Sequence, residues 1–595
     1  MPSSIARVAP ARAAALSFLL VAACTGSIDG GGGGTPSSNG APGASTPGSG
    51  SPGSGPGPGP VGPGPAGPGP SMPGTTGGTG PGSSCSVVDP GPSPLRRLTR
   101  LEYDNTVRML LGTTSKVAAE LLPADEEQFG FDNSAEGRGL NGALAGGYLN
   151  AAERLAKEAL GKLDTILPCD PVAKGDTTCL DQFLDGFGQR AWRRPLDADE
   201  KDNLRQVFAT GKGSGNFANG IDAVIQVMLL SPQFLYRDER GVQEAGKDYL
   251  RLTNWELASR LSYFLWGSMP DDQLFAAARD GKLSTREEIT AQARRMVKDE
   301  RALAMMNNFY GQWLELKQLD SLTKEPVFPT FKEGPASMGG TAALMRLETE
   351  NLVQNILQTD GKLSTLFTAP YTFMNGPLAA FYGASGVSGD QFQKVPVDPA
   401  QRAGIVTQGG FLASHATPEP GLTALIFRGR FVREHFLCEE MPEPPPDAAD
   451  MSPPVTPTTT PRSWSKARRE IAACGGCHAL IDPIGYGFEN FNEIGLPRPQ
   501  ATDASGEIVG SDVAGPFNGA VELAKKLAGS KQARDCVATQ WFRFAQGRKE
   551  DSMRDSCSLT ALRSAFDKAD GDLSELLVAL TQTDAFLLRS KGAAQ

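Results

Sequence analysis

The chain has 595 residues and a formal net charge of −10. One hydrophobic core does not organise this length, because chains beyond about 250–300 residues divide into several packed units. Lys and Arg are interspersed with Asp and Glu, so the basic stripe that nucleic-acid binding requires is missing and we expect no nucleic-acid partner.

The N-terminus has the pattern of an export signal. Two arginines precede the apolar run 13–23, which is too short for a membrane span of about 20 residues. The run ends in Val21-Ala22-Ala23-Cys24, which resembles the bacterial lipobox, where cleavage exposes a cysteine that receives lipid. We expect a lipoprotein anchored in the membrane through Cys24. Thr25 replaces the Asp linked to inner-membrane retention, so we expect the outer membrane, facing the periplasm or the cell surface; an ordinary signal peptide is the alternative.

Residues 25–84 are dominated by Gly, Pro and Ser and contain one charge, Asp29. This composition cannot bury apolar surface, so we expect a disordered tether behind the lipid anchor. A second segment of low complexity, 441–462, is rich in Pro and Thr and predicts a loop.

Helical signals dominate the rest of the chain. Thr99 and Glu102 form a capping box, and Gly112 can end the helix that follows. The same device recurs at Thr253 and Glu256. Strand signals are sparse, so the predicted fold class is mainly α, with several consecutive helical units. The strongest helical patterns cover 142–163, 180–192, 199–210, 221–230, 286–319, 342–358, 520–527 and 573–580.

One motif, in the C-terminal third, predicts chemistry. Residues 474–478 read Cys-Gly-Gly-Cys-His, the CxxCH signature of c-type haem attachment. The two thiols add across the haem vinyl groups, and the adjacent histidine lies under the iron. Export favours this interpretation, because haem c is attached outside the cytoplasm. We predict one covalent haem c per chain, bound by Cys474, Cys477 and the proximal iron ligand His478.

Two other sites could use the same cysteines. A zinc site needs further ligands, usually a second paired cluster, and the chain has only three histidines. A dithiol redox pair is expected in a βαβ context, which the sequence does not indicate.

The residues after the motif predict the surroundings of the haem. Ile484, Tyr486, Phe488 and Phe491 are apolar and can wall a haem face, although a plain core segment is the alternative. The Pro483 carbonyl can accept a hydrogen bond from the second ring nitrogen of the histidine, a device that fixes the orientation of iron ligands.

The sixth iron position has four candidates: Met441, Met451, His415 and His435. We favour Met441 ahead of Met451, because a short chain joined to the haem motif raises the local concentration of a ligand. His435 belongs to a predicted helix over 426–437 with a partly solvated face, which restricts its reach. Methionine ligation would raise the reduction potential. A hydrolase pair at Ser414-His415 lacks an elbow glycine pattern and a placed acid.

Six cysteines remain after Cys24 and the motif, and an even number outside the cytoplasm predicts up to three disulfides. Cys169–Cys179 and Cys536–Cys557 are close in sequence and are the natural pairs. Cys85–Cys438 follows by elimination, although connectivity cannot be read from sequence.

Seven segments occur in an order that resembles a known family. Together they resemble large secreted bacterial proteins built from consecutive domains of unknown function around a Planctomycete-type cytochrome c motif, from Leu95 to the C-terminus. The resemblance implies a c-type haem at Cys474, Cys477 and His478 and implies little about activity. Phe491-Asn492 replaces the Phe-Asp of that family. The segments are RRLTRLEYDNTVRMLLG (96–112), AWRRPLDADE (191–200), LLSPQFLYRDE (229–239), LTNWELASRLSYFLWGSMPDDQL (252–274), GGFLASHATPEPGLTALIFRGRFVREHFLCEEMPEPPP (409–446), CGGCHALIDPIGYGFENFNEIG (474–495) and WFRFAQGR (541–548).

Three functions are compatible with these features. Electron transfer to an unidentified redox partner is the first expectation. The size, about 500 ordered residues, exceeds what one haem needs. A haem-dependent oxidoreductase and a surface scaffold or polymer-binding protein with structural haem therefore stay open. The predicted units are a signal peptide (1–23), the lipid-anchored linker (24–92), N-terminal and second helical units (93–165 and 166–240), a central helical domain (241–370), the haem-bearing domain (371–500) with its Pro-rich insertion (441–462), and a C-terminal helical unit (501–595).

Overall fold

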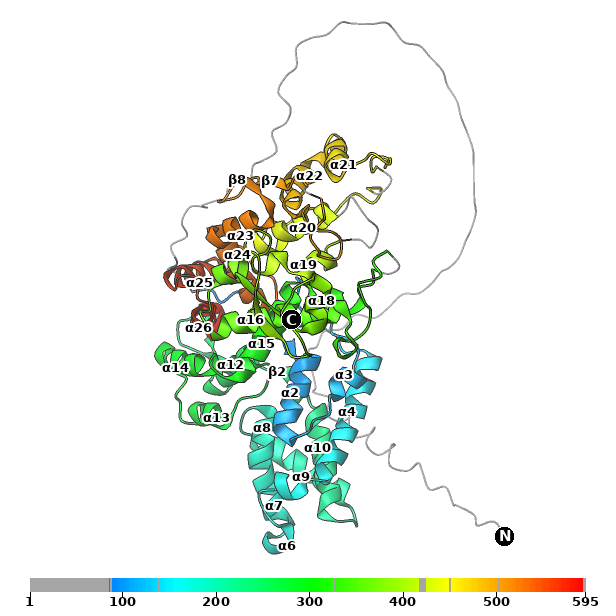
Figure 1. Ribbon diagram of the computed structural model, residues 1–595. Helices are drawn as coiled ribbons and strands as arrows, with labels where there is room; N and C mark the ends of the chain where they lie inside the picture. The colour runs from blue at the N-terminus through cyan, green and yellow to red at the C-terminus, as the bar shows by residue number, and fades with distance from the viewer. Residues whose placement is uncertain are drawn as a thin grey trace, which may run out of the picture. The chain divides into compact units, whose positions relative to one another are not determined.

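The computed structural model describes residues 85, 88–136, 139–324, 327–416, 424–448, 451–500 and 502–591. The expected signal peptide, the lipidated Cys24 and the tether lie outside the described residues. Within them the fold is mainly helical, as predicted (Figure 1). No helix in this part of the chain has the length and apolar character that crossing a membrane requires.

The N-terminal helices share a core of their own. Helix α2 (Arg100–Leu111) begins at the capping box of Thr99 and Glu102 and ends at Gly112, which has a φ of 60°, as predicted. Helix α10 (Phe217–Leu230) packs against both α4 (Gly142–Leu160) and α9 (Ala198–Lys212), and each of the three helices buries an apolar face. Shorter elements complete this part: α3 (Val117–Leu121), α5 (Leu163–Ile166), α6 (Pro171–Lys174), α7 (Asp176–Phe183), the π-helical turn η1 (Leu184–Gly188), α8 (Gln189–Trp192) and α11 (Pro232–Leu235).

The central and C-terminal helices build a second, joint core. Trp541 of α24 (Lys531–Gln546) stacks on Phe309 of α15 (Glu300–Trp313), with ring centroids 3.7 Å apart. Because these aromatic rings come from distant parts of the chain, the C-terminal helices are part of the central core. The other helices of this core are α12 (Asn254–Trp266), α13 (Asp272–Arg279), α14 (Arg286–Met296), α16 (Thr341–Gln358), α25 (Ser556–Lys568), α26 (Leu573–Leu580) and α27 (Asp584–Leu587), with the 3-10 turns η2 (Leu316–Ser321) and η3 (Ala336–Met338).

Short strands join segments that are far apart in sequence. Strand β9 (Leu588–Ser590) pairs antiparallel with β4 (Tyr249–Arg251), which pairs with β3 (Val242–Gln243). Strand β1 (Arg96–Arg97) pairs with β2 (Tyr236–Arg237). The Arg96 guanidinium also donates a hydrogen bond of 2.6 Å to the Ala545 carbonyl, so the first and last described segments meet.

The segment that precedes the C-terminal helices in the chain carries the CxxCH motif. Helix α20 (Ala424–Phe431) crosses α22 (Ala472–Gly485) at two glycines. A Cβ atom on Gly429 would lie 2.1 Å from the Ile481 carbonyl oxygen, and one on Gly485 would lie 1.9 Å from the Leu425 carbonyl oxygen. The two backbones are therefore in direct contact. The remaining elements are α17 (Leu363–Thr368), β5 (Tyr371–Met374), α18 (Gly376–Tyr382), β6 (Gln393–Pro396), η4 (Ile405–Thr407), α19 (Gly409–Ser414), the π-helical turn η5 (Val432–Phe436), α21 (Pro461–Arg469), η6 (Tyr486–Phe488), β7 (Ser505–Ile508), β8 (Gly515–Asn518) and α23 (Gly519–Gly529).

Three disulfides join described cysteines, and one of the three predicted pairings is confirmed. Cys169 is bonded to Cys179, as predicted. The other two pairings are wrong, because the structure joins Cys85 to Cys557 and Cys438 to Cys536. Cys536 lies on α24 and faces the end of η5, where its Sγ atom is 3.2 Å from the His435 carbonyl oxygen. Helix packing, and not distance along the chain, therefore decides the partner.

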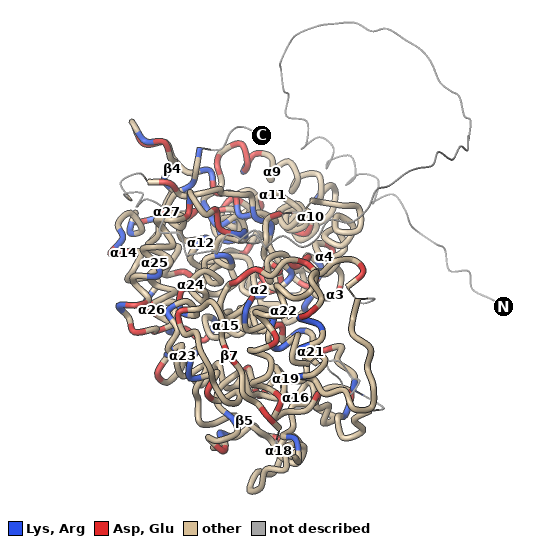
Figure 2. Tube along the Cα trace, turned by 90° about the horizontal axis from the view of Figure 1, so that it is seen from above, with Lys and Arg blue, Asp and Glu red and all other residues tan. Residues whose placement is uncertain are grey.

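Charged side chains are spread over the described helices. Figure 2 shows basic and acidic residues interspersed over the trace, between stretches of other residues. Many of them form ion pairs, such as Arg543 of α24 with Glu550 in the connection that follows this helix.

Candidate functional site

The CxxCH motif lies on helix α22, which forms a hairpin with α21 (both yellow in Figure 1). Cys474, Cys477 and His478 occupy positions i, i+3 and i+4, which lie on one face of a helix. Among the described cysteines these two are the only ones outside a disulfide. The helix therefore presents two thiols and an imidazole together, as the motif predicts.

Local sequence explains the hairpin. Thr460 caps α21 through a hydrogen bond from the Ser463 backbone, and Pro461 occupies the first helical position, where its missing N–H costs nothing. Gly475 allows the two helices to approach closely, since a Cβ atom there would lie 2.5 Å from the Arg469 carbonyl oxygen. The hairpin thus fixes how α22 presents the motif.

The imidazole of His478 is held by Asp482, one helical turn further on. The His478 Nδ1 atom lies 2.9 Å from Asp482 Oδ1, and the aspartate side chain is fully buried. The hydrogen bond predicted to the Pro483 carbonyl is therefore wrong. That carbonyl points elsewhere, because a Cβ atom on Gly506 would lie 2.4 Å from it. The i, i+4 spacing in a helix gives Asp482 the shorter path to the ring.

Three further side chains are linked to the aspartate through consecutive hydrogen bonds. Ser465 of α21 forms a hydrogen bond of 2.5 Å with Asp482 Oδ2 and another of 2.7 Å with the Tyr486 hydroxyl. Arg469 donates to the same Tyr486 hydroxyl over 3.4 Å. The aspartate thus joins both helices of the hairpin.

The apolar residues after the motif belong mainly to the core. Ile484, Phe488 and Phe491 are buried in the joint core, and Phe488 packs against Phe411 with ring centroids 5.5 Å apart. Tyr486 differs, because its hydroxyl points to Ser465. Three of these four residues are therefore core residues, which is the alternative that the sequence left open.

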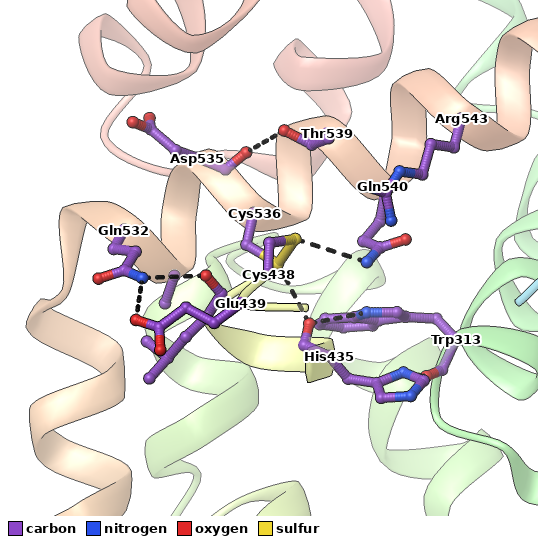
Figure 3. Close-up of a disulfide and its surroundings, with 12 residues drawn as sticks. Trp313, His435, Cys438, Glu439, Gln532, Asp535, Cys536, Thr539, Gln540 and Arg543 are labelled. Atoms are coloured by element: carbon purple, nitrogen blue, oxygen red, sulfur yellow. Dashed lines mark hydrogen bonds between the residues drawn. A yellow bond between two sulfur atoms is a disulfide. The ribbon is translucent and has the colours of Figure 1, made fainter. Parts of the chain in front are cut away.

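Both remaining histidines are engaged with Glu315. The Nε2 atoms of His415 and His435 lie 3.4 and 3.3 Å from its two carboxylate oxygens. His435 Nδ1 donates to the Trp313 carbonyl over 3.0 Å, and the Trp313 indole donates back to the His435 carbonyl (Figure 3). His415 Nδ1 lies 2.9 Å from the Phe411 carbonyl. Each imidazole therefore has a hydrogen-bond partner on Nδ1 and lies within ion-pair distance of Glu315 through Nε2, although Nε2 of His415 forms no hydrogen bond.

The sequence did not point to Glu315. Its backbone has a φ of 54°, an unusual conformation for a residue other than glycine. Burial by itself would raise the pKa of Glu315, but hydrogen bonds from His415 and His435 outweigh it and lower the pKa below its usual range. Because the histidines are about 100 and 120 residues away in the chain, no local signal could reveal this cluster.

The segment that leads to Met441 is fixed on two sides. Cys438 is bonded to Cys536 of α24, and Gln532 donates to Glu439 over 2.8 Å (Figure 3). Glu439 also accepts from Arg433, whose Nε atom donates to the Leu480 carbonyl of the haem-motif helix over 3.1 Å. Cys438 and Glu439 are therefore anchored to α24, and Glu439 is also linked to α22 through Arg433.

The segment around Met451 is attached to α21. Met451 is half-buried, and two residues further on the Pro453 carbonyl accepts a hydrogen bond of 3.0 Å from the Trp464 indole. The residues just before Met441 are thus linked to α24 and α22, and those just after Met451 are linked to α21.

Five family models match the chain in consecutive, non-overlapping ranges. Each is described as a protein of unknown function: DUF1587 over 96–161, DUF1595 over 179–239, DUF1592 over 252–384, DUF1588 over 402–501 and DUF1585 over 515–586. Their order is the domain pattern of the Planctomycete-type cytochrome c family. The predicted resemblance is thereby confirmed. No curated protein and no solved structure matches the chain.

Within this Planctomycete-type pattern the site falls into a single matched range. The DUF1588 model, named PSCyt3, covers 402–501 and so includes α20, the α21–α22 hairpin and both methionine candidates. In the part of the chain that the structure describes, no group of three or more His, Cys, Asp or Glu side chains is arranged to hold a metal ion.

Proposed function

We propose that this protein is an exported c-type cytochrome that carries one covalent haem and transfers electrons to a redox partner outside the cytoplasm. The observation that carries the proposal is the helical face with Cys474, Cys477 and His478. The six other described cysteines are paired in disulfides, so this pair alone keeps its thiols, as thioether formation with haem requires.

The donor set fits a haem iron. The Asp482 carboxylate can only accept, so His478 Nδ1 carries the proton of that hydrogen bond and Nε2 is left as the nitrogen with a free electron pair. When bound, haem c supplies a one-electron redox centre. The buried hydrogen bond orients the imidazole before the iron is present.

The proposal is tested by the covalent haem content of protein produced with a haem c maturation system. We expect one haem per chain after denaturation and none in the Cys474→Ala/Cys477→Ala variant. The matched control is Cys169→Ala/Cys179→Ala, which also removes two cysteines but leaves the motif intact. Covalent haem retained in the first variant, or missing from the parent, would refute the assignment.

We propose Met441 as the distal ligand. It follows closely after Cys438 and Glu439, which are anchored to α24 and, through Arg433, linked to the haem-motif helix, and this limits the volume that Met441 can explore. His415 and His435, the histidine candidates, are already bound to Glu315. The weak long-wavelength charge-transfer band of His/Met haem should appear in the ferric parent, vanish in Met441→Ala and persist in Met451→Ala. If the band persists in Met441→Ala, Met441 is not the distal iron ligand.

We propose that the protein is held at the outer membrane by lipid on Cys24. The support is the apolar run 13–23 that ends in Val21-Ala22-Ala23-Cys24. The parent should partition into detergent. The Cys24→Ser variant should instead be soluble or keep its uncleaved signal peptide. Mass spectrometry that finds an unmodified N-terminus elsewhere would contradict the lipoprotein assignment.

A haem-dependent oxidoreductase is the second candidate, and one observation favours it. A buried carboxylate on the proximal histidine increases the basicity of the iron ligand, which favours higher oxidation states of the metal. The spin state separates the two functions: a six-coordinate, low-spin iron supports electron transfer, and an open, high-spin iron supports catalysis on a bound substrate.

A further inference from the structure

A chain of hydrogen bonds with a single direction ends on the carboxylate behind His478. Arg469 can only donate, so its guanidinium donates to the Tyr486 hydroxyl. Asp482 only accepts, so the Ser465 hydroxyl donates to it. The Tyr486 hydroxyl must then give its proton to Ser465. Each donor in the sequence Arg469, Tyr486, Ser465 thus points toward Asp482.

The carboxylate receives donors on both oxygens. His478 Nδ1 lies 2.9 Å from Oδ1, and Ser465 Oγ lies 2.5 Å from Oδ2. The carboxylate therefore acts as an acceptor on both oxygens. The positive charge that balances it stands at the far end of the chain, on Arg469, and a second guanidinium, Arg462, lies 4.2 Å from the centre of the Tyr486 ring.

The environment strengthens this arrangement. Asp482 and Ser465 are fully buried, and Tyr486 is 7% exposed. In a medium of low dielectric constant, hydrogen bonds in a chain polarise one another, and a negative charge acts over a longer range than in water. The charge of the aspartate therefore acts on the neighbouring His478 imidazole with little screening by water.

We propose that Asp482 is a positioning residue that sets the reduction potential of the proposed haem, and that Arg469, Tyr486 and Ser465 hold its carboxylate in place as the acceptor for His478 Nδ1. The proposal rests on the proposed haem at Cys474, Cys477 and His478. A negatively charged acceptor on Nδ1 makes the imidazole a stronger donor to iron, and the ferric state gains more from this than the ferrous state. The potential is thereby lowered, in opposition to a distal methionine, which raises it.

The test compares the reduction potential of the full-length parent with that of Asp482→Asn. Asparagine has nearly the same shape and keeps an oxygen that accepts from Nδ1, but it carries no charge. We expect the balance between ferrous and ferric protein to shift at least tenfold toward the ferrous form, a rise of about 59 mV for one electron. The iron–histidine stretching frequency of the ferrous protein should fall in parallel.

Two further variants separate this role from a structural one. Tyr486→Phe breaks the chain one step away from the aspartate, so it should shift the potential in the same direction by a smaller factor. The matched control is Asp503→Asn, which removes a nearby negative charge that is paired with Arg462 and 63% exposed. It should leave the potential close to that of the parent.

The outcomes distinguish this inference from the proposed function. A parent without covalent haem refutes the proposed function itself. A haem-loaded Asp482→Asn variant with the potential and the stretching frequency of the parent overturns the role of Asp482. If Asp482→Asn does not retain haem, the Tyr486→Phe variant decides between the outcomes. A reduction potential equal to that of the parent overturns the proposal. A reduction potential higher than that of Asp503→Asn supports it.

Discussion

The crossing of α20 and α22 predicts that a single methyl group will loosen the haem-motif helix. In Gly485→Ala the new Cβ atom would lie 1.9 Å from the Leu425 carbonyl oxygen, whereas carbon and oxygen atoms need about 3.3 Å. The atom on the other side is backbone and cannot rotate away. The two helices must therefore move apart by more than about 1 Å. A gap of about this size removes up to half of the dispersion energy of each atom pair in contact.

The magnitude follows from what the crossing buries. Leu425, Ile481 and Ile484 are between 0 and 5% exposed and lie next to the two glycines. Overpacking of this kind costs about 1–3 kcal/mol, and more where the backbone is the obstacle. Alanine gains at most about 1 kcal/mol of helix propensity over glycine. We expect Gly485→Ala to lower the free energy of unfolding by a net amount of about 2 kcal/mol.

The assay is guanidinium unfolding followed by circular dichroism, with hydrogen exchange of peptides from α20 and α22. The matched control is Gly146→Ala in α4, where no atom lies within 4 Å of the new Cβ atom and the glycine is exposed. That variant should be as stable as the parent or up to about 1 kcal/mol more stable. The reasoning fails if both variants unfold at the same denaturant concentration, or if exchange in α22 is unchanged.

Two further measurements concern stability. Removing the Cys438–Cys536 disulfide by alanine substitution should cost roughly 4.7 kcal/mol and removing Cys169–Cys179 roughly 2.7 kcal/mol, because the closed loops span 98 and 10 residues. Unfolding under non-reducing conditions checks this order, and equal losses would contradict it. Burial lowers the pKa of Lys324 from 10.5 to about 8. Between these pH values the unfolded chain keeps a proton that the folded chain has lost, so stability should rise with pH, and Lys324→Met should flatten that rise in pH-dependent unfolding.

Local patterns predicted local structure. The capping boxes of Thr99 with Glu102 and of Thr253 with Glu256 begin α2 and α12 as expected, because every atom involved lies within one helical turn. Asp482 was within reach of the same logic. Its i, i+4 spacing from His478 is visible in the sequence, but the prediction gave that hydrogen bond to a carbonyl instead.

Long-range pairing could not be predicted in this way. The partner of Cys536 depends on how α24 packs against η5, and the sequence around Cys536 carries no signal for Cys438. The same holds for Glu315, whose contacts come from helices far along the chain. Packing of apolar faces decides such neighbours, and a pattern of apolar residues does not specify which faces meet.

The Cys85–Cys557 disulfide has a mechanical consequence. Residues 1–84 join the rest of the chain at Cys85, so a pull on them reaches a covalent branch there. One path of that branch leads directly into α25, and strand β9, which pairs with β4, follows α25 in the chain. A force applied through Cys85 is thus shared, while the disulfide is intact, between the segment that leads to β1 and the C-terminal helix α25.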